Sequence, residues 1–382
     1  MKQQPIAANA KPSVWSIAGP RFKTGDQMRK ETMRHPMTRR GFAAATLAMT
    51  ALAAGGSVRA QSLAEDLSVV DPQLRGPLAH PERMKIPSMT EQDLIAFRQK
   101  APPPGAPFLA TPTVVTRQIR GPLGPDTLRV FVINAAGKAG RPAILHIHGG
   151  GYILGSPTTD IPNLQRIAAA QDCVIVSVDY RLAPETRFPG ALEDNYAALG
   201  WLHDNAEAWG IDRRRVIVMG ESAGGGHAAA LAIAARDRGQ FKLAGQVLVY
   251  PMLDDRTGST RQPPVEQGRY VWTPEQNRLG WGALLGMPAG SPDPPRGSVP
   301  ARVEDLRGLP PTFIGVGGLD LFLQEDIDYA RRLMDSGVST ELLVVPGAYH
   351  AFPFIVPGAD VSRRFFAAID TAIARLLASP TP

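Results

Sequence analysis

The fold is decided by the stretch Arg215-Val-Ile-Val-Met-Gly-Glu-Ser-Ala-Gly224, which leads into His227-Ala-Ala-Ala-Leu-Ala-Ile-Ala-Ala235. The apolar run predicts a buried strand, and the Ala-rich run predicts a helix. Between them, glycines flank Ser222 where a Cβ would collide with the neighbouring strand or helix. A strand, a sharp turn and a helix in this order predict an exposed nucleophilic serine. The helix N-terminus adds backbone N–H groups and a partial positive charge.

Outward from this turn, short apolar runs alternate with longer helical patterns from about residue 113. The alternation predicts an α/β fold with a mostly parallel, eight-stranded sheet and helices on both faces. We expect strands at Thr113–Ile119, Thr127–Asn134, Ala143–Ile147, Val174–Val178, Val216–Met219, Gln246–Tyr250, Thr312–Val316 and Glu341–Val345. We expect helices near Thr90–Gln99, Pro189–Asn205, Gly225–Arg236, Gln324–Ser336 and Val361–Ala378. The first two strands should pair antiparallel at one edge.

A second glycine motif, His148-Gly-Gly-Gly-Tyr152, follows the predicted strand Ala143–Ile147. Three glycines expose backbone N–H groups and allow a substrate oxygen to approach closely. A phosphate-binding loop is the alternative, but it would need a G-K-[ST] ending or G-x-G-x-x-G spacing, and neither is present. We therefore predict an oxyanion-binding loop, oriented by His148.

A general base and its carboxylate partner are predicted from their positions in the chain. His350 follows the last predicted strand, and Asp320 follows the strand before it. Both therefore lie at the carboxyl edge of the sheet, where ligands of α/β proteins bind. Glu325 and Asp326 are alternative acids, although we expect them at the start of the next helix, where carboxylates suit the helix N-terminus. We favour Asp320, in the order serine, acid, histidine.

Together these residues resemble the hormone-sensitive-lipase-like group of α/β-hydrolases, family IV of the bacterial esterases. The resemblance runs from about residue 80 to residue 375. It rests on His148-Gly-Gly-Gly-Tyr-Ile-Leu-Gly-Ser156, Asp179-Tyr-Arg-Leu-Ala-Pro-Glu185, Phe188-Pro189, Gly220-Glu-Ser-Ala-Gly-Gly225, Leu319-Asp320 and Pro346-Gly-Ala-Tyr-His350. Glu221 is a departure, because the group usually has Asp before the serine; its supporting role should survive the extra methylene.

The resemblance implies an α/β-hydrolase fold and a serine esterase with the catalytic triad Ser222, Asp320 and His350. It implies an oxyanion hole formed by Gly150, Gly151 and Ala223. It also suggests short- to medium-chain acyl esters, and it implies neither a metal nor an organic cofactor. An amidase, carbamate hydrolase or lactone hydrolase would use the same triad, and a non-catalytic ligand-binding homologue is a further alternative.

Two segments fall outside the strand–helix alternation and predict a small cap. Residues 61–112 hold one helical pattern and a Pro-rich run, and residues 255–305 form an insertion in the catalytic domain 113–382. We expect the insertion to be irregular, with exposed aromatic side chains beside a cleft. Tyr152, Tyr270 and Trp272 are candidate substrate-binding residues, and Trp281 completes the aromatic cluster.

Residues 1–60 read as an N-terminal leader with an export signal. Arg39-Arg40 precedes an apolar run, and Val58-Arg59-Ala60 resembles a cleavage site. Paired arginines favour a twin-arginine signal and a periplasmic location. The leader carries 10 Lys/Arg and 2 Asp/Glu out of 41 and 35 in the chain, which leaves 31 and 33. Residues 61–382 are therefore close to neutral, which argues against nucleic-acid binding.

Cys173, the single cysteine of the sequence, excludes an intrachain disulfide and is expected in a buried strand. Arg181 with a neighbouring carboxylate is expected to support the loops. We predict a small-molecule ester substrate and no membrane span in the mature chain. A homodimer stays open.

Overall fold

The computed structural model describes residues 67–79, 89–100, 107–135 and 139–378. Contacts along the chain separate residues 1–65 from residues 66–382. The predicted export signal lies outside the described residues, which all belong to the second unit.

The core of this unit is one eight-stranded sheet in the order β1-β2-β4-β3-β5-β6-β7-β8. β2 is antiparallel to both β1 and β4, and the other neighbours are parallel. This confirms the predicted fold class and the antiparallel edge. The strands are β1 (Val114–Gly121), β2 (Gly124–Ile133), β3 (Arg141–Ile147), β4 (Val174–Asp179), β5 (Ile211–Glu221), β6 (Gly245–Val249), β7 (Thr312–Gly317) and β8 (Thr340–Val345).

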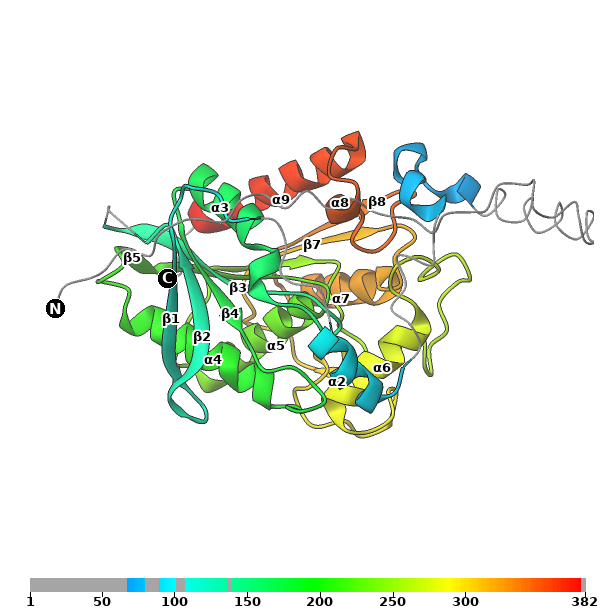
Figure 1. Ribbon diagram of the computed structural model, residues 1–382, viewed down its shortest axis with the longest axis horizontal. Helices are drawn as coiled ribbons and strands as arrows, with labels where there is room; N and C mark the ends of the chain where they lie inside the picture. The colour runs from blue at the N-terminus through cyan, green and yellow to red at the C-terminus, as the bar shows by residue number, and fades with distance from the viewer. Residues whose placement is uncertain (1–66, 80–88, 101–106, 136–138, 379–382) are drawn as a thin grey trace, which may run out of the picture. The chain divides into compact units, whose positions relative to one another are not determined.

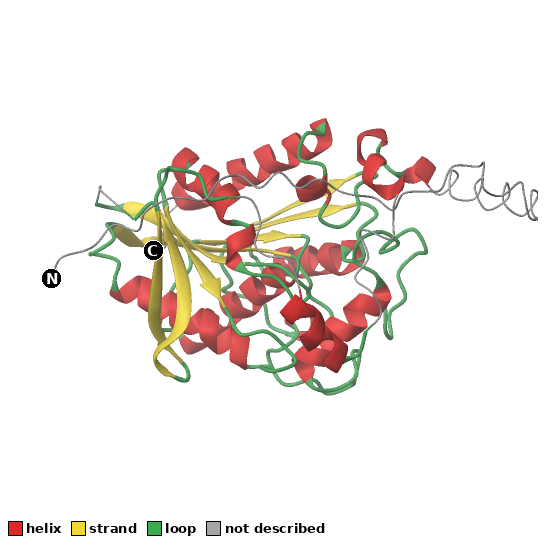
Figure 2. Cartoon of the chain, viewed as in Figure 1, coloured by secondary structure: helices red, strands yellow, loops and turns green. Residues whose placement is uncertain are grey.

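Helices cover both faces of the sheet (Figures 1 and 2). On β5, Val216 and Val218 pack in one core cluster, and Ile217 and Met219 pack in the other, because successive side chains of a strand point to opposite faces. The first cluster contains residues of α4 (Gly190–Asp204), α5 (Ala223–Arg238) and α7 (Leu323–Asp335). The second contains residues of α3 (Ile161–Ala170), α8 (Phe352–Ile355) and α9 (Asp360–Ala378).

The predicted irregular insertion contains a helix, α6 (Pro274–Leu285), so the expectation of an irregular segment is wrong. Thr273 accepts the N–H of Gln276, whose side chain accepts the N–H of Thr273, and together they form a capping box. Gly286 ends the helix in the left-handed conformation. The Pro and Gly content of the segment concealed these end signals. The helices α3 and α8 were not predicted either.

A third apolar cluster joins the two predicted cap segments above the serine turn. It includes Leu94 from α2 (Glu91–Lys100), Trp281 and Leu284 from α6, and Ala223, the residue after Ser222. Burial of apolar side chains from both segments holds them beside the serine turn.

Candidate active site

Ser222 occupies a strained turn between β5 and α5. Its φ and ψ angles are 56° and −121°, outside the regions that residues with a side chain normally adopt. A Cβ on Gly220 would lie 2.3 Å from the carbonyl oxygen of Gly224, and one on Gly224 would lie 2.0 Å from that of Ile147. Only glycine fits at both flanking positions, and the serine side chain is therefore held at the end of the strand.

Ser222, His350 and Asp320 form a continuous hydrogen-bonded chain. The distance from His350 Nε2 to Ser222 Oγ is 3.0 Å, and that from His350 Nδ1 to Asp320 Oδ2 is 2.8 Å. Asp320 Oδ1 also accepts the N–H of Phe322 at 3.0 Å, and all three side chains are buried. A carboxylate at Nδ1 favours a proton on that nitrogen, which leaves Nε2 free to accept the serine hydroxyl proton.

Two aromatic rings fix the imidazole of His350. The ring centre of Tyr250 lies 4.8 Å from that of the imidazole, and the ring centre of Phe322 lies 5.2 Å from it. The two rings are inclined to the imidazole plane by 66° and 89°, so the contacts are edge to face. These contacts restrict rotation of the ring, so the two hydrogen bonds of His350 are pre-organised.

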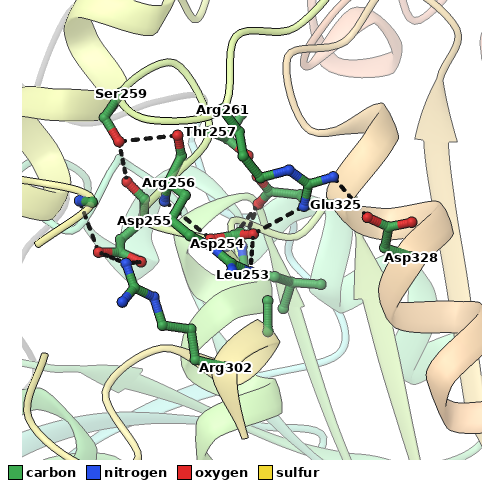
Figure 3. A network of polar contacts seen from close by, with 12 residues as sticks. Leu253, Asp254, Asp255, Arg256, Thr257, Ser259, Arg261, Arg302, Glu325 and Asp328 are labelled. Carbon is green, nitrogen blue, oxygen red and sulfur yellow. Dashed lines mark hydrogen bonds and ion pairs between the residues drawn. The ribbon is translucent and has the colours of Figure 1, made fainter. Parts of the chain in front are cut away.

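The alternative acids, Glu325 and Asp326, lie in the first turn of α7, whereas His350 forms its hydrogen bonds with Asp320 and Ser222. Glu325 accepts the N–H groups of Leu253 at 2.6 Å and Asp254 at 3.0 Å, as Figure 3 shows. Burial, with Asp254 adding to it, raises the pKa of Glu325, and burial also raises that of Asp326. Of the three carboxylates, Asp320 is the one paired with the imidazole.

Ion pairs beside Glu325 attach the start of the cap to α7 and to the segment after α6 (Figure 3). Asp254 accepts from Arg256 and Arg261, and Arg261 also pairs with Asp328 of α7. Asp255 pairs with Arg302. Asp254 and Asp255 are buried, so each carboxylate is compensated by a cation.

The glycine loop lies directly beside the nucleophile. A Cβ on Gly149 would lie 3.4 Å from Ser222 Cβ. Gly150 and Gly151 have φ angles of 125° and 62°, which favour glycine. No backbone carbonyl among the described residues accepts the N–H of Gly150 or Gly151. Together with Ala223 at the N-terminus of α5, these residues offer donors to a substrate oxygen.

His148 supports this loop, as the sequence predicts. Its Nδ1 lies 2.8 Å from the carbonyl oxygen of Gly149, and its ring stacks on Tyr180 at 4.2 Å. Burial lowers the pKa of His148 to about 3, although the Gly149 carbonyl opposes the shift. Burial likewise lowers the pKa of His227 to about 3. Both imidazoles are therefore neutral at physiological pH.

A buried polar network beneath the serine turn was not predicted from the sequence. His146 Nε2 lies 2.9 Å from Glu221 Oε2, and its Nδ1 lies 2.8 Å from Ser177 Oγ. Asp160 approaches the same group, so that ligand-type atoms of His146, Asp160 and Glu221 lie within 4.8 Å of one another. This set could coordinate a cation, but both nitrogens of His146 already have protein partners. We therefore assign Glu221 and His146 to support of the turn.

The charges of this network are coupled. Burial lowers the pKa of His146, but the nearby carboxylates of Glu221 and Asp160 together outweigh burial, and the pKa is raised. Burial and the negative charge of Glu221 raise the pKa of Asp160 to about 7. A substantial fraction of Asp160 therefore carries a proton near neutral pH.

The predicted aromatic cluster is buried, so the expectation of exposed side chains is wrong. The Tyr152 hydroxyl donates to the Met252 carbonyl at 2.7 Å, and Tyr270 packs against Tyr349 with ring centres 6.0 Å apart. Trp272 is 5% exposed and lies against the glycine loop. Packing within the cap segments buries these side chains more completely than the sequence indicated.

The loop after β4 is held by ion pairs. Arg181 makes a two-pronged contact with Asp194, at 2.8 Å for the closest pair, which agrees with the structural role predicted for Arg181. Glu185 pairs with Arg98 of α2. Cys173 is fully buried, and burial raises the pKa of its thiol to about 12. Such a thiol is a core residue rather than a nucleophile.

Residues 144–354 match a protein family described as having the alpha/beta hydrolase fold. The chain is 34% identical over 311 residues to esterase LipI of Mycobacterium tuberculosis (strain ATCC 25618 / H37Rv), covering 78% of this chain and 92% of that protein. It is 31% identical over 296 residues to an arylesterase of Saccharolobus solfataricus, covering 74% and 92%.

Solved structures show the same likeness. A bacterial heroin esterase has 35% identity and a TM-score of 0.71, with coverage of 81% of this chain and 98% of that chain. An esterase from the hyperthermophilic archaeon Pyrobaculum calidifontis has 30% identity and a TM-score of 0.67, with coverage of 80% and 98%. In the part of the chain that the structure describes, every helix is too short or too polar to cross a membrane.

Proposed function

The chain belongs to the hormone-sensitive-lipase-like group of the α/β-hydrolase family, and from this premise we propose that Ser222, His350 and Asp320 are the catalytic triad of its carboxylesterase activity. Relatives that are 31–34% identical include an esterase, an arylesterase and a carboxylesterase, which supports ester hydrolysis. The observation that carries the proposal is the unbroken chain of contacts, 3.0 Å and 2.8 Å long, that begins at the serine turn.

In the proposed mechanism, His350 takes the hydroxyl proton as Ser222 Oγ attacks the ester carbonyl. Asp320 stabilises the imidazolium that forms. The N–H groups of Gly150, Gly151 and Ala223 donate to the oxyanion, each contributing roughly 3 kcal/mol in comparable sites. His350 then gives its proton to the leaving alcohol, and the C–O bond breaks to leave an acyl enzyme. Water repeats the sequence, regenerates Ser222 and releases the carboxylic acid.

We propose that the preferred acyl groups are short to medium in length. The packed cap cluster includes Ala223, next to the nucleophile, and Ser222 is only 8% exposed. For p-nitrophenyl esters from C2 to C16, we expect kcat/KM to be highest at about C4 to C8. The measurement is the initial rate across the series; an optimum at C12 or longer would rule out a short acyl pocket.

The same triad would also serve an amidase, a carbamate hydrolase or a lactone hydrolase. Turnover of p-nitrophenyl butyrate and of the matching butyranilide at one enzyme concentration separates the first of these from an esterase. An enzyme specialised for esters should hydrolyse the butyrate ester faster than the butyranilide. The ratio of the two enzymatic rates should be far larger than the ratio of the uncatalysed rates of these compounds. A non-catalytic homologue would turn over neither compound.

We propose that the protein is exported to the periplasm, which the Arg39-Arg40 pair and the Val58-Arg59-Ala60 sequence support. Expression in a bacterium with an intact twin-arginine pathway should yield periplasmic protein whose N-terminus is near Gln61. The matched control is Arg39→Lys combined with Arg40→Lys, which should keep the chain in the cytoplasm. Retention of the parent protein in the cytoplasm with its leader intact would contradict the proposal.

A further inference from the structure

Gly151 of the glycine loop lies between two parts of the cap. A Cβ on Gly280 in α6 would lie 2.4 Å from the carbonyl oxygen of Gly151, so the backbone of the helix touches this residue. A Cβ on Gly151 would lie 2.1 Å from Cη2 of Trp272, just before the same helix. Contacts this close are too short for any real Cβ, so the two glycines and the indole are fitted to one another.

The indole of Trp272 is held in place by α6 itself. Its Nε1 donates to Asn277 Oδ1 at 3.1 Å, and Asn277 Nδ2 donates to the Thr257 carbonyl at 2.8 Å. The capping box of Thr273 and Gln276 fixes the turn between the indole and the helix. The ring is therefore a fixed surface rather than a mobile wall.

The residue after Gly151 is also held by the cap. The ring of Tyr152 lies 4.9 Å from that of Trp281 in α6, and its hydroxyl donates to the Met252 carbonyl. Gly151 and Tyr152 both have positive φ angles, of 62° and 69°. Left-handed conformations at consecutive positions persist only where the surrounding packing holds them. Here α6, Trp272 and Met252 contribute to that packing.

We propose that Trp272 and Gly280 are positioning residues of the oxyanion hole, so that α6 orients the N–H of Gly151 in addition to covering the substrate. This inference rests on the proposed function, because it assigns the glycine loop to the oxyanion. A donor displaced by about 1 Å loses much of its transition-state stabilisation. Disturbing the contact should therefore reduce kcat for every acyl length and leave the preferred length unchanged.

The test compares two glycine-to-alanine substitutions in one helix. Gly280→Ala places a methyl group against the Gly151 carbonyl, whereas in Gly282→Ala the nearest atom is the Met287 carbonyl oxygen at 3.7 Å. Both changes raise helix propensity by a similar amount. We expect Gly280→Ala to lower kcat at least tenfold on p-nitrophenyl acetate and butyrate, with KM changed less than threefold. Gly282→Ala should keep the wild-type kcat.

A second variant tests the proposal independently of whether Gly280→Ala folds. Trp272→Phe retains an aromatic ring but removes the part of the indole that touches Gly151 and the donor to Asn277. We expect a smaller loss of kcat, an unchanged chain-length optimum, and a matching fall in the rate at which a fluorophosphonate labels the enzyme. Thermal unfolding of each variant shows whether the fold is kept.

Equal kcat values for Gly280→Ala and Gly282→Ala would overturn the proposal. If Gly280→Ala does not fold, Trp272→Phe decides alone: a shifted chain-length optimum with unchanged kcat on acetate would make Trp272 a pocket wall and contradict a positioning role. Failure of the proposed function would be distinct, because the wild type would then show no ester turnover that depends on Ser222.

Discussion

Replacing Ser222 with alanine should lower kcat/KM for p-nitrophenyl butyrate by about 10³-fold or more and leave the fold intact. The substitution removes the one oxygen that accepts the acyl group and lies 3.0 Å from His350 Nε2. It creates no clash, because alanine is serine without its hydroxyl. The measurement is the initial rate per mole of folded protein, with folding checked by circular dichroism and thermal unfolding.

A matched control is Ser362→Ala in α9. Ser362 is fully buried, and its hydroxyl has no hydrogen-bond partner among the described residues. This variant should retain wild-type kcat/KM, since it removes a buried serine hydroxyl that makes no hydrogen bond to the triad. Wild-type activity in Ser222→Ala would show that ester turnover arises at another residue.

Replacing Asp320 with asparagine should lower kcat by about 10³- to 10⁴-fold, whereas Glu325→Gln should cost less than tenfold. Asp320 Oδ2 is the partner of His350 Nδ1, and an amide there no longer stabilises the imidazolium. Glu325 accepts two backbone N–H groups, which a glutamine carbonyl oxygen can also accept. Because burial raises the pKa of Glu325, its neutral form is favoured, and glutamine resembles that form.

The two variants are compared by kcat at saturating ester and by the midpoint of urea unfolding. For Glu325→Gln we expect any change to appear in the midpoint, because this residue attaches the cap to α7. If Glu325→Gln reduced kcat as severely as Asp320→Asn, Asp320 could no longer be assigned as the acid of the triad.

Much of the fold could be predicted because its signals are local. Apolar runs such as Val216–Met219 indicate directly that a strand is buried on both faces of the sheet. All eight expected strands are present. The helix α6 was missed although Thr273-Pro-Glu-Gln276 and Gly286 mark its ends. Of its two glycines, which weaken the helical pattern, Gly280 is explained by its close approach to Gly151, a contact between distant parts of the chain.

For the site, too, the features that local sequence patterns determine could be predicted, and those that depend on long-range packing could not. Ser222, Asp320 and His350 each follow a strand, and the carboxyl ends of parallel strands meet at one edge, so their convergence could be anticipated. The network around His146 could not, because it depends on the register that places His146 beside Ser177 and on the position of Asp160 before α3. Burial of Trp272 likewise follows from packing that no local pattern encodes.

The most direct test of Ser222 as the nucleophile is to label the protein with a fluorophosphonate and locate the adduct by peptide mass spectrometry. The tryptic peptide covering residues 216–236 contains one serine, Ser222. We expect a single adduct, on this peptide, that forms as ester turnover is lost and is absent from Ser222→Ala. An adduct on another peptide that accompanies the loss of turnover, or equal labelling of Ser222→Ala, would contradict Ser222 as the nucleophile.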